Sequence, residues 1–304
     1  MPGKIRIGIS GWRYPPWRKV FYPPDLTQKR ELEFASRALP TIEINGSFYG
    51  LQRPASYMRW YDATPEGFVF SVKANRYVTH ILRLNQAETA IANFFASGLF
   101  HLKEKLGPIL WQFPPSFRFN PESFENFLKL LPHDTEAAAE FARRHHEGPL
   151  ERAYLEIDKQ RPFQHAVEIR NQSFVEKAFV DLLRQYKVAL VIADTAGKWP
   201  YREDVTADFV YLRLHGAEEL YASGYTESAL KNWAARIKAW SEGRQPEDAH
   251  LIVDRDPPQR KARDVYCYFD NDIKVKAPFD ARKLLGLLNL EQGLAPLDHP
   301  GSLI

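Results

Sequence analysis

Short apolar segments alternate with longer segments of helical periodicity along most of the chain. Eight apolar segments are mostly rich in Val, Ile, Phe or Tyr, which favour β-strands: Ile5–Ser10, Thr41–Asn45, Phe68–Lys73, Pro108–Gln112, Ala166–Arg170, Val188–Asp194, Phe209–His215 and Val265–Asp270. Candidate helices lie between them at Arg30–Ala38, Gln86–Phe100, Pro121–Leu131, Phe174–Gln185 and Ser228–Ser241. Strands that alternate with helices pair in parallel. The pattern predicts a TIM-like (β/α)8 barrel, with an open doubly wound sheet as the alternative.

Two stretches depart from this alternation. Pro132–Phe163 is too long for a simple connection and contains a predicted helix at Glu136–Arg144, followed by a charged run. It is interpreted as an insertion after the fourth strand and its helix. Trp199–Asp208 is predicted to be a loop. We therefore expect one barrel domain over residues 1–290, with an insertion at about 132–163, and an irregular tail over 291–304.

Polar side chains gather where the predicted strands end. Because side chains alternate along a strand, Glu43 shares a face with Asn45, and Glu168 shares one with Arg170. Further polar residues end the other strands: Lys73, Gln112, Asp194, Arg213, His215, Asp270 and Asn271. Barrel enzymes build their active sites at the carboxyl ends of the strands. An ion-pair network that only braces the barrel is the alternative, although buried ion pairs cost desolvation energy.

The charges of this set nearly cancel. Four are carboxylates and three are cations: Glu43, Glu168, Asp194 and Asp270 against Lys73, Arg170 and Arg213. Divalent-metal sites concentrate carboxylates and histidines without several cations beside them. We therefore expect no metal and no cofactor; a metal held by Glu168, Asp194, His215 and Asp270 is the alternative. A mixed set suits a polar or anionic organic ligand, which arginine binds bidentately.

Three residues have candidate catalytic roles. Glu43 and Glu168 could form an acid–base pair, since two carboxyl groups in different environments can hold different protonation states. Alternatively, Arg170 or Lys73 holds each of them ionised. Lys73 could form a Schiff base, or it could bind an anion. His215 is a candidate proton shuttle or an ordinary loop histidine.

Aromatic residues lie near the same strand ends, among them Trp12 and Tyr268. Many belong in the core, but some could stack on a sugar or a base. A nucleic-acid-binding or nucleic-acid-processing barrel is therefore the second functional hypothesis. The charge of the chain argues against this hypothesis. With 41 basic and 38 acidic residues the net charge is only +3, whereas nucleic-acid-binding proteins usually carry a clear excess of positive charge.

Composition narrows the class of protein further, to a globular chain without disulfides or predicted membrane spans. Of 304 residues, 44% are hydrophobic and 26% charged, as in ordinary globular proteins. Cys267 is the single cysteine and lies in a predicted strand, which excludes an internal disulfide and indicates a core thiol. No run of about 18 apolar residues predicts a membrane span, and no secretory signal follows Met1, so the expected location is the cytoplasm. Phosphate-loop and dinucleotide motifs are also missing.

Six ordered motifs together resemble the domain-of-unknown-function-72, or YecE-like, family. They are Ile7-Gly8-Ile9-Ser10-Gly11-Trp12, Glu43-Ile44-Asn45-Gly46-Ser47-Phe48-Tyr49, Phe70-Ser71-Val72-Lys73-Ala74, Leu110-Trp111-Gln112-Phe113-Pro114-Pro115, Glu168-Ile169-Arg170-Asn171-Gln172-Ser173-Phe174 and Tyr268-Phe269-Asp270-Asn271-Asp272. The resemblance implies a single TIM-like barrel and no established activity. The Pro132–Phe163 insertion and Gly46 depart from the common pattern.

We therefore expect a TIM-barrel protein that acts, as an enzyme, on a polar or anionic small molecule at the C-terminal face of the barrel. The sequence leaves open whether it turns this ligand over. It also leaves open the substrate, the reaction and the oligomeric state.

Overall fold

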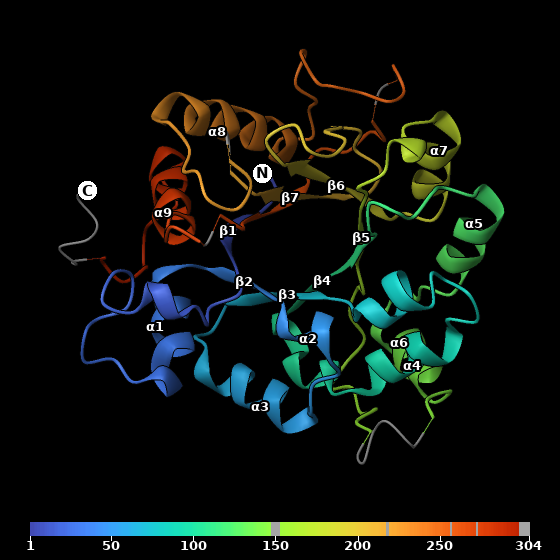
Figure 1. Ribbon diagram of the computed structural model, residues 1–304, viewed down its shortest axis with the longest axis horizontal. Helices are drawn as coiled ribbons and strands as arrows, with labels where there is room; N and C mark the ends of the chain where they lie inside the picture. The colour runs from blue at the N-terminus through green and yellow to red at the C-terminus, as the bar shows by residue number, and fades with distance from the viewer. Residues whose placement is uncertain (147–152, 217–218, 256, 272, 298–304) are drawn as a thin grey trace. The chain divides into compact units, whose positions relative to one another are not determined.

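Eight parallel strands form a closed barrel in the order β1 to β8 in the computed structural model (Figure 1). The structure describes residues 1–146, 153–216, 219–255, 257–271 and 273–297. The strands are β1 Ile5–Ser10, β2 Thr41–Ile44, β3 Val69–Lys73, β4 Leu106–Gln112, β5 His165–Glu168, β6 Ala189–Asp194, β7 Phe209–Leu214 and β8 Asp264–Phe269. The predicted TIM-like fold is confirmed, and the open sheet is excluded.

The strands are buried almost throughout, which explains their apolar sequences. Parallel strands covered on both faces need apolar side chains on both, and β4, β6 and β7 consist mainly of buried residues. Several strands end one or two residues before their predicted carboxyl ends. Arg170 lies two residues beyond β5, and His215 and Asp270 each lie one residue beyond their strands. These three side chains therefore belong to the loops that leave the barrel.

All five of the helices expected between strands are present, with shifted ends. The α-helices are α1 Glu31–Ala38, α2 Gly46–Tyr49, α3 Pro54–Ala63, α4 Glu88–Ala96, α5 Pro121–Lys129, α6 Thr135–Ala142, α7 Lys177–Gln185, α8 Glu227–Ser241 and α9 Ala277–Leu287. Short helices of other types are η1 Pro15–Trp17, η2 Gln28–Arg30, η4 Leu99–Lys105 and η5 Gln172–Phe174, and η3 Tyr77–Ile81 is a π-helix. The strand–helix pattern did not predict α2, α3, α9 or η3.

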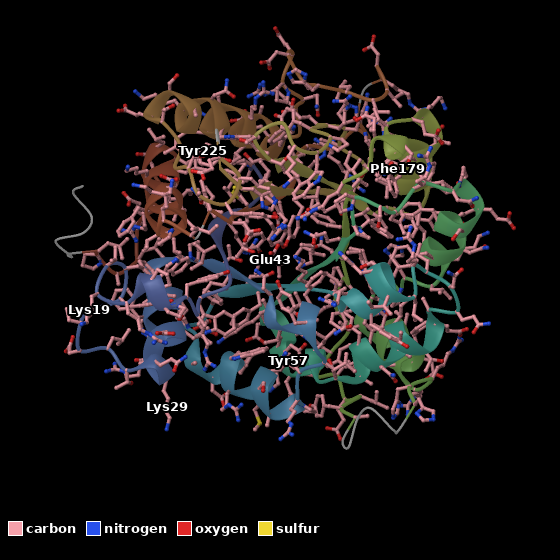
Figure 2. All side chains as sticks on the ribbon, viewed as in Figure 1. Lys19, Lys29, Glu43, Tyr57, Phe179 and Tyr225 are labelled. Carbon is pink, nitrogen blue, oxygen red and sulfur yellow. The ribbon has the colours of Figure 1, made fainter. Side chains whose placement is uncertain are left out.

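The chain divides into two compact units. Unit 1 comprises Met1–Glu43 and Ala189–Ile304. In it β6, β7, β8, β1 and β2 pair in that order, and α9 packs against β1 and β8 (Figure 1). Gly8 lets β1 approach its neighbour, because a Cβ there would lie 1.8 Å from the Thr41 carbonyl oxygen. Figure 2 labels Glu43 on β2 and shows Lys19 and Lys29 projecting outward.

Unit 2 comprises Ile44–Val188. Strands β3, β4 and β5 pair in order, with Gln112 opposite Glu168 at the carboxyl end. Helix α4 packs against α6, and α5 packs against α7. Two of these helices begin with a side-chain cap: the Asn120 side chain accepts from the Ser123 N–H in α5, and the Asp134 side chain accepts from the Ala137 N–H in α6. Such caps satisfy backbone N–H groups that have no partner inside the helix.

The predicted insertion and tail lie partly outside the described residues. Within 132–163, α6 takes the place of the helix expected at Glu136–Arg144, and an isolated bridge joins Asp134 to Pro162. Residues 147–152 of the insertion and 298–304 of the tail lie outside the described residues, and the single-domain prediction stays a prediction. No helix in the described part of the chain combines the length and apolar character that a membrane crossing needs.

Candidate functional site

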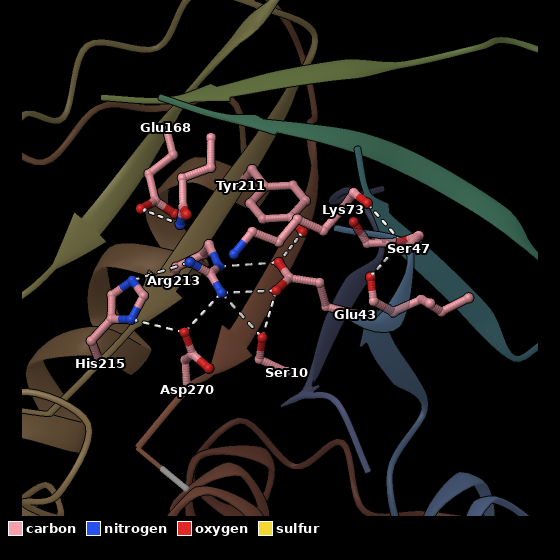
Figure 3. Close-up of polar contacts among 12 residues, drawn as sticks. Ser10, Glu43, Ser47, Lys73, Glu168, Tyr211, Arg213, His215 and Asp270 are labelled. Atoms are coloured by element: carbon pink, nitrogen blue, oxygen red, sulfur yellow. Dashed lines mark hydrogen bonds and ion pairs between the residues drawn. The ribbon is translucent and has the colours of Figure 1, made fainter. Parts of the chain in front are cut away.

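A buried polar cluster lies at the carboxyl ends of β1, β2, β7 and β8 in unit 1 (Figure 3). We call it the Arg213 cluster, and its members are Ser10, Glu43, Tyr211, Arg213, His215 and Asp270. Arg213 donates to both carboxylate oxygens of Glu43 at 2.9 and 3.1 Å and to Oδ2 of Asp270 at 2.8 Å. It also donates to Ser10 Oγ at 3.1 Å.

Glu43 accepts two further hydrogen bonds in this cluster. The Ser10 hydroxyl donates to Oε1 at 2.5 Å, and the Tyr211 hydroxyl donates to Oε2 at 2.6 Å. Glu43 and Arg213 are both fully buried, whereas Asp270 keeps 9% of its surface exposed. Charge-assisted bonds of this number offset much of the desolvation cost of a buried ion pair. The arrangement therefore has the form of a brace between strand ends, with Asp270 at its exposed side.

His215 extends the Arg213 cluster through Asp270. Its Nδ1 lies 3.0 Å from Asp270 Oδ2, which is close enough for an ion pair, although the orientation does not meet hydrogen-bond geometry. Its Nε2 lies 3.4 Å from Arg213 Nη1. The ring of Tyr221 meets the His215 ring edge-on at 5.2 Å. The imidazole is thus fixed between a carboxylate, a cation and an aromatic ring.

Asp194 and Asn271 lie beside this cluster but make other contacts. Asp194 accepts from the Tyr225 hydroxyl at 3.0 Å, and burial raises its pKa. Asn271 donates to the Ser223 carbonyl and to Asp280 Oδ2, both at 2.9 Å. These bonds hold the loop between β8 and α9. The structure thus gives the amide of Asn271 a bracing contact.

Trp12 and Tyr268 are core residues of unit 1. Tyr268 is fully buried and hydrogen-bonds to Thr41 Oγ1 at 2.9 Å, and burial raises its pKa well above the usual value. Trp12 is 7% exposed, and its carbonyl accepts from the Tyr22 hydroxyl at 2.5 Å. Cys267 is buried as expected, and burial raises the pKa of its thiol.

A second polar cluster lies at the carboxyl ends of β3, β4 and β5 in unit 2. We call it the Glu168 cluster, and its members are Phe48, Lys73, His80, Gln112, Glu168 and Arg170. Glu168 Oε1 accepts from Arg170 Nε at 2.7 Å and from Gln112 Nε2 at 2.9 Å. Glu168 is fully buried, but the Arg170 side chain is 13% exposed. The pairing of Glu168 with Arg170 is therefore real, and it reaches the protein surface.

Lys73 joins this cluster from the end of β3. Its Nζ lies 4.1 Å from the centre of the Phe48 ring, and it is 8% exposed. A cation–π contact stabilises an ammonium group, which fits an anion-binding lysine better than a Schiff-base nucleophile. Ser47 fixes the strand end by donating to the Lys73 carbonyl at 2.6 Å (Figure 3).

His80 is the member of this cluster that sequence reasoning missed. It lies on the π-helix η3, its ring meets Phe48 edge-on at 5.1 Å, and its Nδ1 lies 2.8 Å from Thr79 Oγ1. Burial, followed by the cations Lys73, Arg170 and Arg76, lowers its pKa to about 4. His80 is therefore neutral near pH 7. Nothing in the sequence around it marked a strand end.

The remaining predicted residue of this region, Asn45, follows β2 directly. It occupies the N-cap position of α2 without a side-chain cap bond and is partly exposed. Tyr211 was also missed, although its spacing gave a signal. It lies two residues before Arg213 on the same strand and therefore on the same face.

Neither cluster concentrates metal ligands. Within the described residues, no group of three or more His, Cys, Asp or Glu side chains has the arrangement of a metal site. Glu43 and Glu168 belong to different units, and each is bonded inside its own cluster. The predicted acid–base pairing of these two carboxyl groups stays a prediction.

The fold and the two clusters define a TIM-barrel protein with charged side chains at the carboxyl ends of its strands. The chain belongs to the family described as "Protein of unknown function DUF72", whose model matches residues 6–302. UPF0759 protein YunF of Bacillus subtilis is 24% identical over 96% of this chain and 98% of its own. UPF0759 protein YecE of Escherichia coli O157:H7 is 23% identical over 80% of this chain and 84% of its own.

A solved structure shows the same fold. The DUF72 family protein of Thermotoga maritima superposes with a TM-score of 0.70 at 23% sequence identity, covering 94% of this chain and 99% of that protein. The names of these relatives state no substrate and no reaction. The chemistry must therefore be argued from the two clusters.

Proposed function

We propose that the protein is an enzyme that acts on an anionic small molecule bound at the Glu168 cluster. The observation that carries this proposal is the pair of cations at the carboxyl ends of β3 and β5, the two strands that flank β4. Lys73 is nearly buried, at 8% exposed, and the Arg170 side chain is 13% exposed. Glu168 accepts hydrogen bonds from both Gln112 and Arg170. In barrels of this type the carboxyl ends of the strands form the active site.

Each side chain has a role that its contacts support. Arg170 and Lys73 attract the anionic group of the ligand, Arg170 through its planar guanidinium and Lys73 as a point charge. Glu168 and Gln112 fix the orientation of Arg170, because Glu168 Oε1 accepts from both. Glu168 can also exchange a proton with a ligand hydroxyl group. The Arg213 cluster, which is more deeply buried, braces the strand ends of unit 1.

Metabolite capture tests this function. Purified protein is incubated with a cell extract of small molecules, separated by gel filtration, denatured and analysed by mass spectrometry. We expect one or a few phosphates or carboxylates to copurify with the wild type and to be lost with Arg170→Met. Arg143→Met is the matched control, because Arg143 pairs with Glu140 on the exposed surface of the same unit. Copurification of neutral compounds only, or equal capture by Arg170→Met, would contradict the proposal.

Exposed aromatic rings on α2 and η3 favour a nucleic-acid ligand as the second candidate. Tyr49 and Tyr77 are 74% and 51% exposed, and Arg76 next to Tyr77 is also exposed. Such rings can stack on unpaired bases. Binding of a single-stranded oligonucleotide, with affinity that falls steeply as salt rises, would support this candidate. A small anion would bind with a shallower salt dependence, since it meets fewer cations.

A further inference from the structure

We propose that His80 is a ligand-binding member of the Glu168 cluster and that it takes up a proton from solvent when an anion binds there. The inference rests on the proposed function and adds to it a proton-exchanging group. It also specifies the ligand class, because the ligand must carry at least one full negative charge next to an acceptor oxygen.

The position of His80 supports this role. Single turns of π-helix are rare and are found frequently at functional sites. Here η3 follows the end of β3 by a few residues, and the half-buried imidazole makes a T-shaped contact with the Phe48 ring. Phe48 also carries Lys73 over its ring. One aromatic side chain therefore positions both the imidazole and a cation.

The hydrogen bond of His80 suits both protonation states. Nδ1 contacts the Thr79 hydroxyl, which can donate to a neutral imidazole or accept from a protonated one. Nε2 has no hydrogen-bond partner among the residues that the structure describes. It can therefore donate to an anion oxygen in either state. Gaining a proton changes the direction of the Thr79 bond without breaking it.

The surrounding charges explain why the imidazole is neutral before an anion binds. Among the described residues, Lys73 from β3, Arg170 from the loop after β5 and Arg76 at the N-cap of η3 oppose its protonation, whereas Glu168 favours it. The negative charge of a bound anion offsets the effect of these cations on the imidazole. It therefore raises the pKa of His80 from about 4 towards its ordinary value near 6.5. Linkage requires the reverse as well, so protonated His80 binds the anion more tightly.

Sulfate is a suitable probe, because its charge stays constant over this pH range. Nuclear magnetic resonance of the histidine rings follows the pKa of His80 with and without sulfate at constant ionic strength, with His80→Gln giving the assignment. We expect sulfate to raise this pKa by about one unit, which is equivalent to about tenfold tighter binding at low pH than at neutral pH. Calorimetry in two buffers should show proton uptake at an intermediate pH, and His80→Gln should abolish it.

Two variants make the test specific. Lys73→Met should weaken sulfate binding and raise the pKa of His80 in the absence of sulfate, because it removes an opposing cation. His101→Gln is the matched control and should behave as wild type. His101 belongs to the same unit but stacks on Tyr154 at 3.5 Å, and its own resonance should not respond to sulfate.

The outcomes separate this inference from the proposed function. If sulfate binds through Lys73 and Arg170 while the His80 resonance stays unchanged, the inference is wrong and the anion site stands. If sulfate does not bind, both are wrong. If sulfate raises the pKa of His80 by the same amount in Lys73→Met as in the wild type, the anion lies elsewhere and the inference is again wrong.

Discussion

His165 illustrates how a single buried residue can set the acid limit of stability. Its imidazole is fully buried, Nδ1 accepts from Trp111 Nε1 at 3.1 Å, and Nε2 faces the Pro132 carbonyl at 2.7 Å. Because the indole N–H can only donate, Nδ1 must be unprotonated and Nε2 must carry the hydrogen. Burial lowers the pKa of His165 to about 3.

The consequence is a loss of stability on acidification. The unfolded chain binds a proton at His165 near pH 6.5 while the folded protein does not, so the free energy of unfolding falls as pH drops from about 6.5 towards 3. His80 and the carboxyl groups add their own contributions. His165→Gln keeps one donor and one acceptor but cannot titrate. We expect a shallower fall over this range, measured by urea unfolding at several pH values.

An exposed histidine provides the comparison. His146→Gln changes a surface side chain and should reproduce the wild-type pH profile. An equally steep fall in His165→Gln would show that His165 is not the source of the acid sensitivity.

At the residue scale, the sequence indicated where charged side chains would gather but not which contacts they make. The pairing of Glu168 with Arg170 followed from their spacing, and the structure shows it at 2.7 Å. The partners of Arg213 come from other strands, so no local pattern could identify them. His80 was missed because its position depends on a π-turn, which has no sequence signature comparable to strand alternation.

At the scale of elements, Arg213 joins the carboxyl ends of four strands. It contacts Ser10 of β1, Glu43 of β2 and Asp270 after β8, and it lies on β7 itself. Arg213→Met keeps most of the side-chain length but leaves two carboxylates without their cation. We expect a loss of about 3–5 kcal/mol in the free energy of unfolding, since removing one partner leaves a buried charge uncompensated.

Chemical denaturation measures this loss. Arg213→Lys should be intermediate, because lysine keeps the charge but cannot form the same set of bonds. Arg143→Met, at an exposed pair at the C-terminal end of α6, should leave the denaturation midpoint unchanged. If Arg213→Met unfolds at the wild-type midpoint but fails to capture the metabolite, Arg213 is a ligand-binding residue, as the sequence analysis expected, and its bracing role is wrong.

The elements themselves were largely predictable because their signals are local. Apolar runs located all eight strands, and the expected helices correspond to six observed α-helices, α6 of the insertion among them. The exceptions have physical reasons. Only Tyr57 of α3 is fully buried, so this helix lacks a wide apolar stripe. Helix α2 has four residues, which is too short for periodicity. Several strands end one or two residues before their predicted carboxyl ends, because the first residues of the following loops continue the alternation of polar and apolar side chains.

At the scale of the whole molecule, strand–helix alternation and the family motifs both predicted the closed parallel barrel. The ligand could not be predicted in the same way. A TIM barrel supports many chemistries through the side chains at its strand ends, and the names of the relatives specify none. The function therefore depends on whether the Glu168 cluster binds a ligand or only supports the fold.

Glu168→Gln tests this most directly, by thermal unfolding with and without the captured anion. Glutamine keeps the shape and an acceptor oxygen for Arg170 and Gln112, so we expect a melting temperature within a few degrees of the wild type. The stabilisation that the ligand gives the wild type should be reduced or lost. A large drop in melting temperature with undiminished ligand stabilisation would contradict the account, because Glu168 would then only brace the barrel.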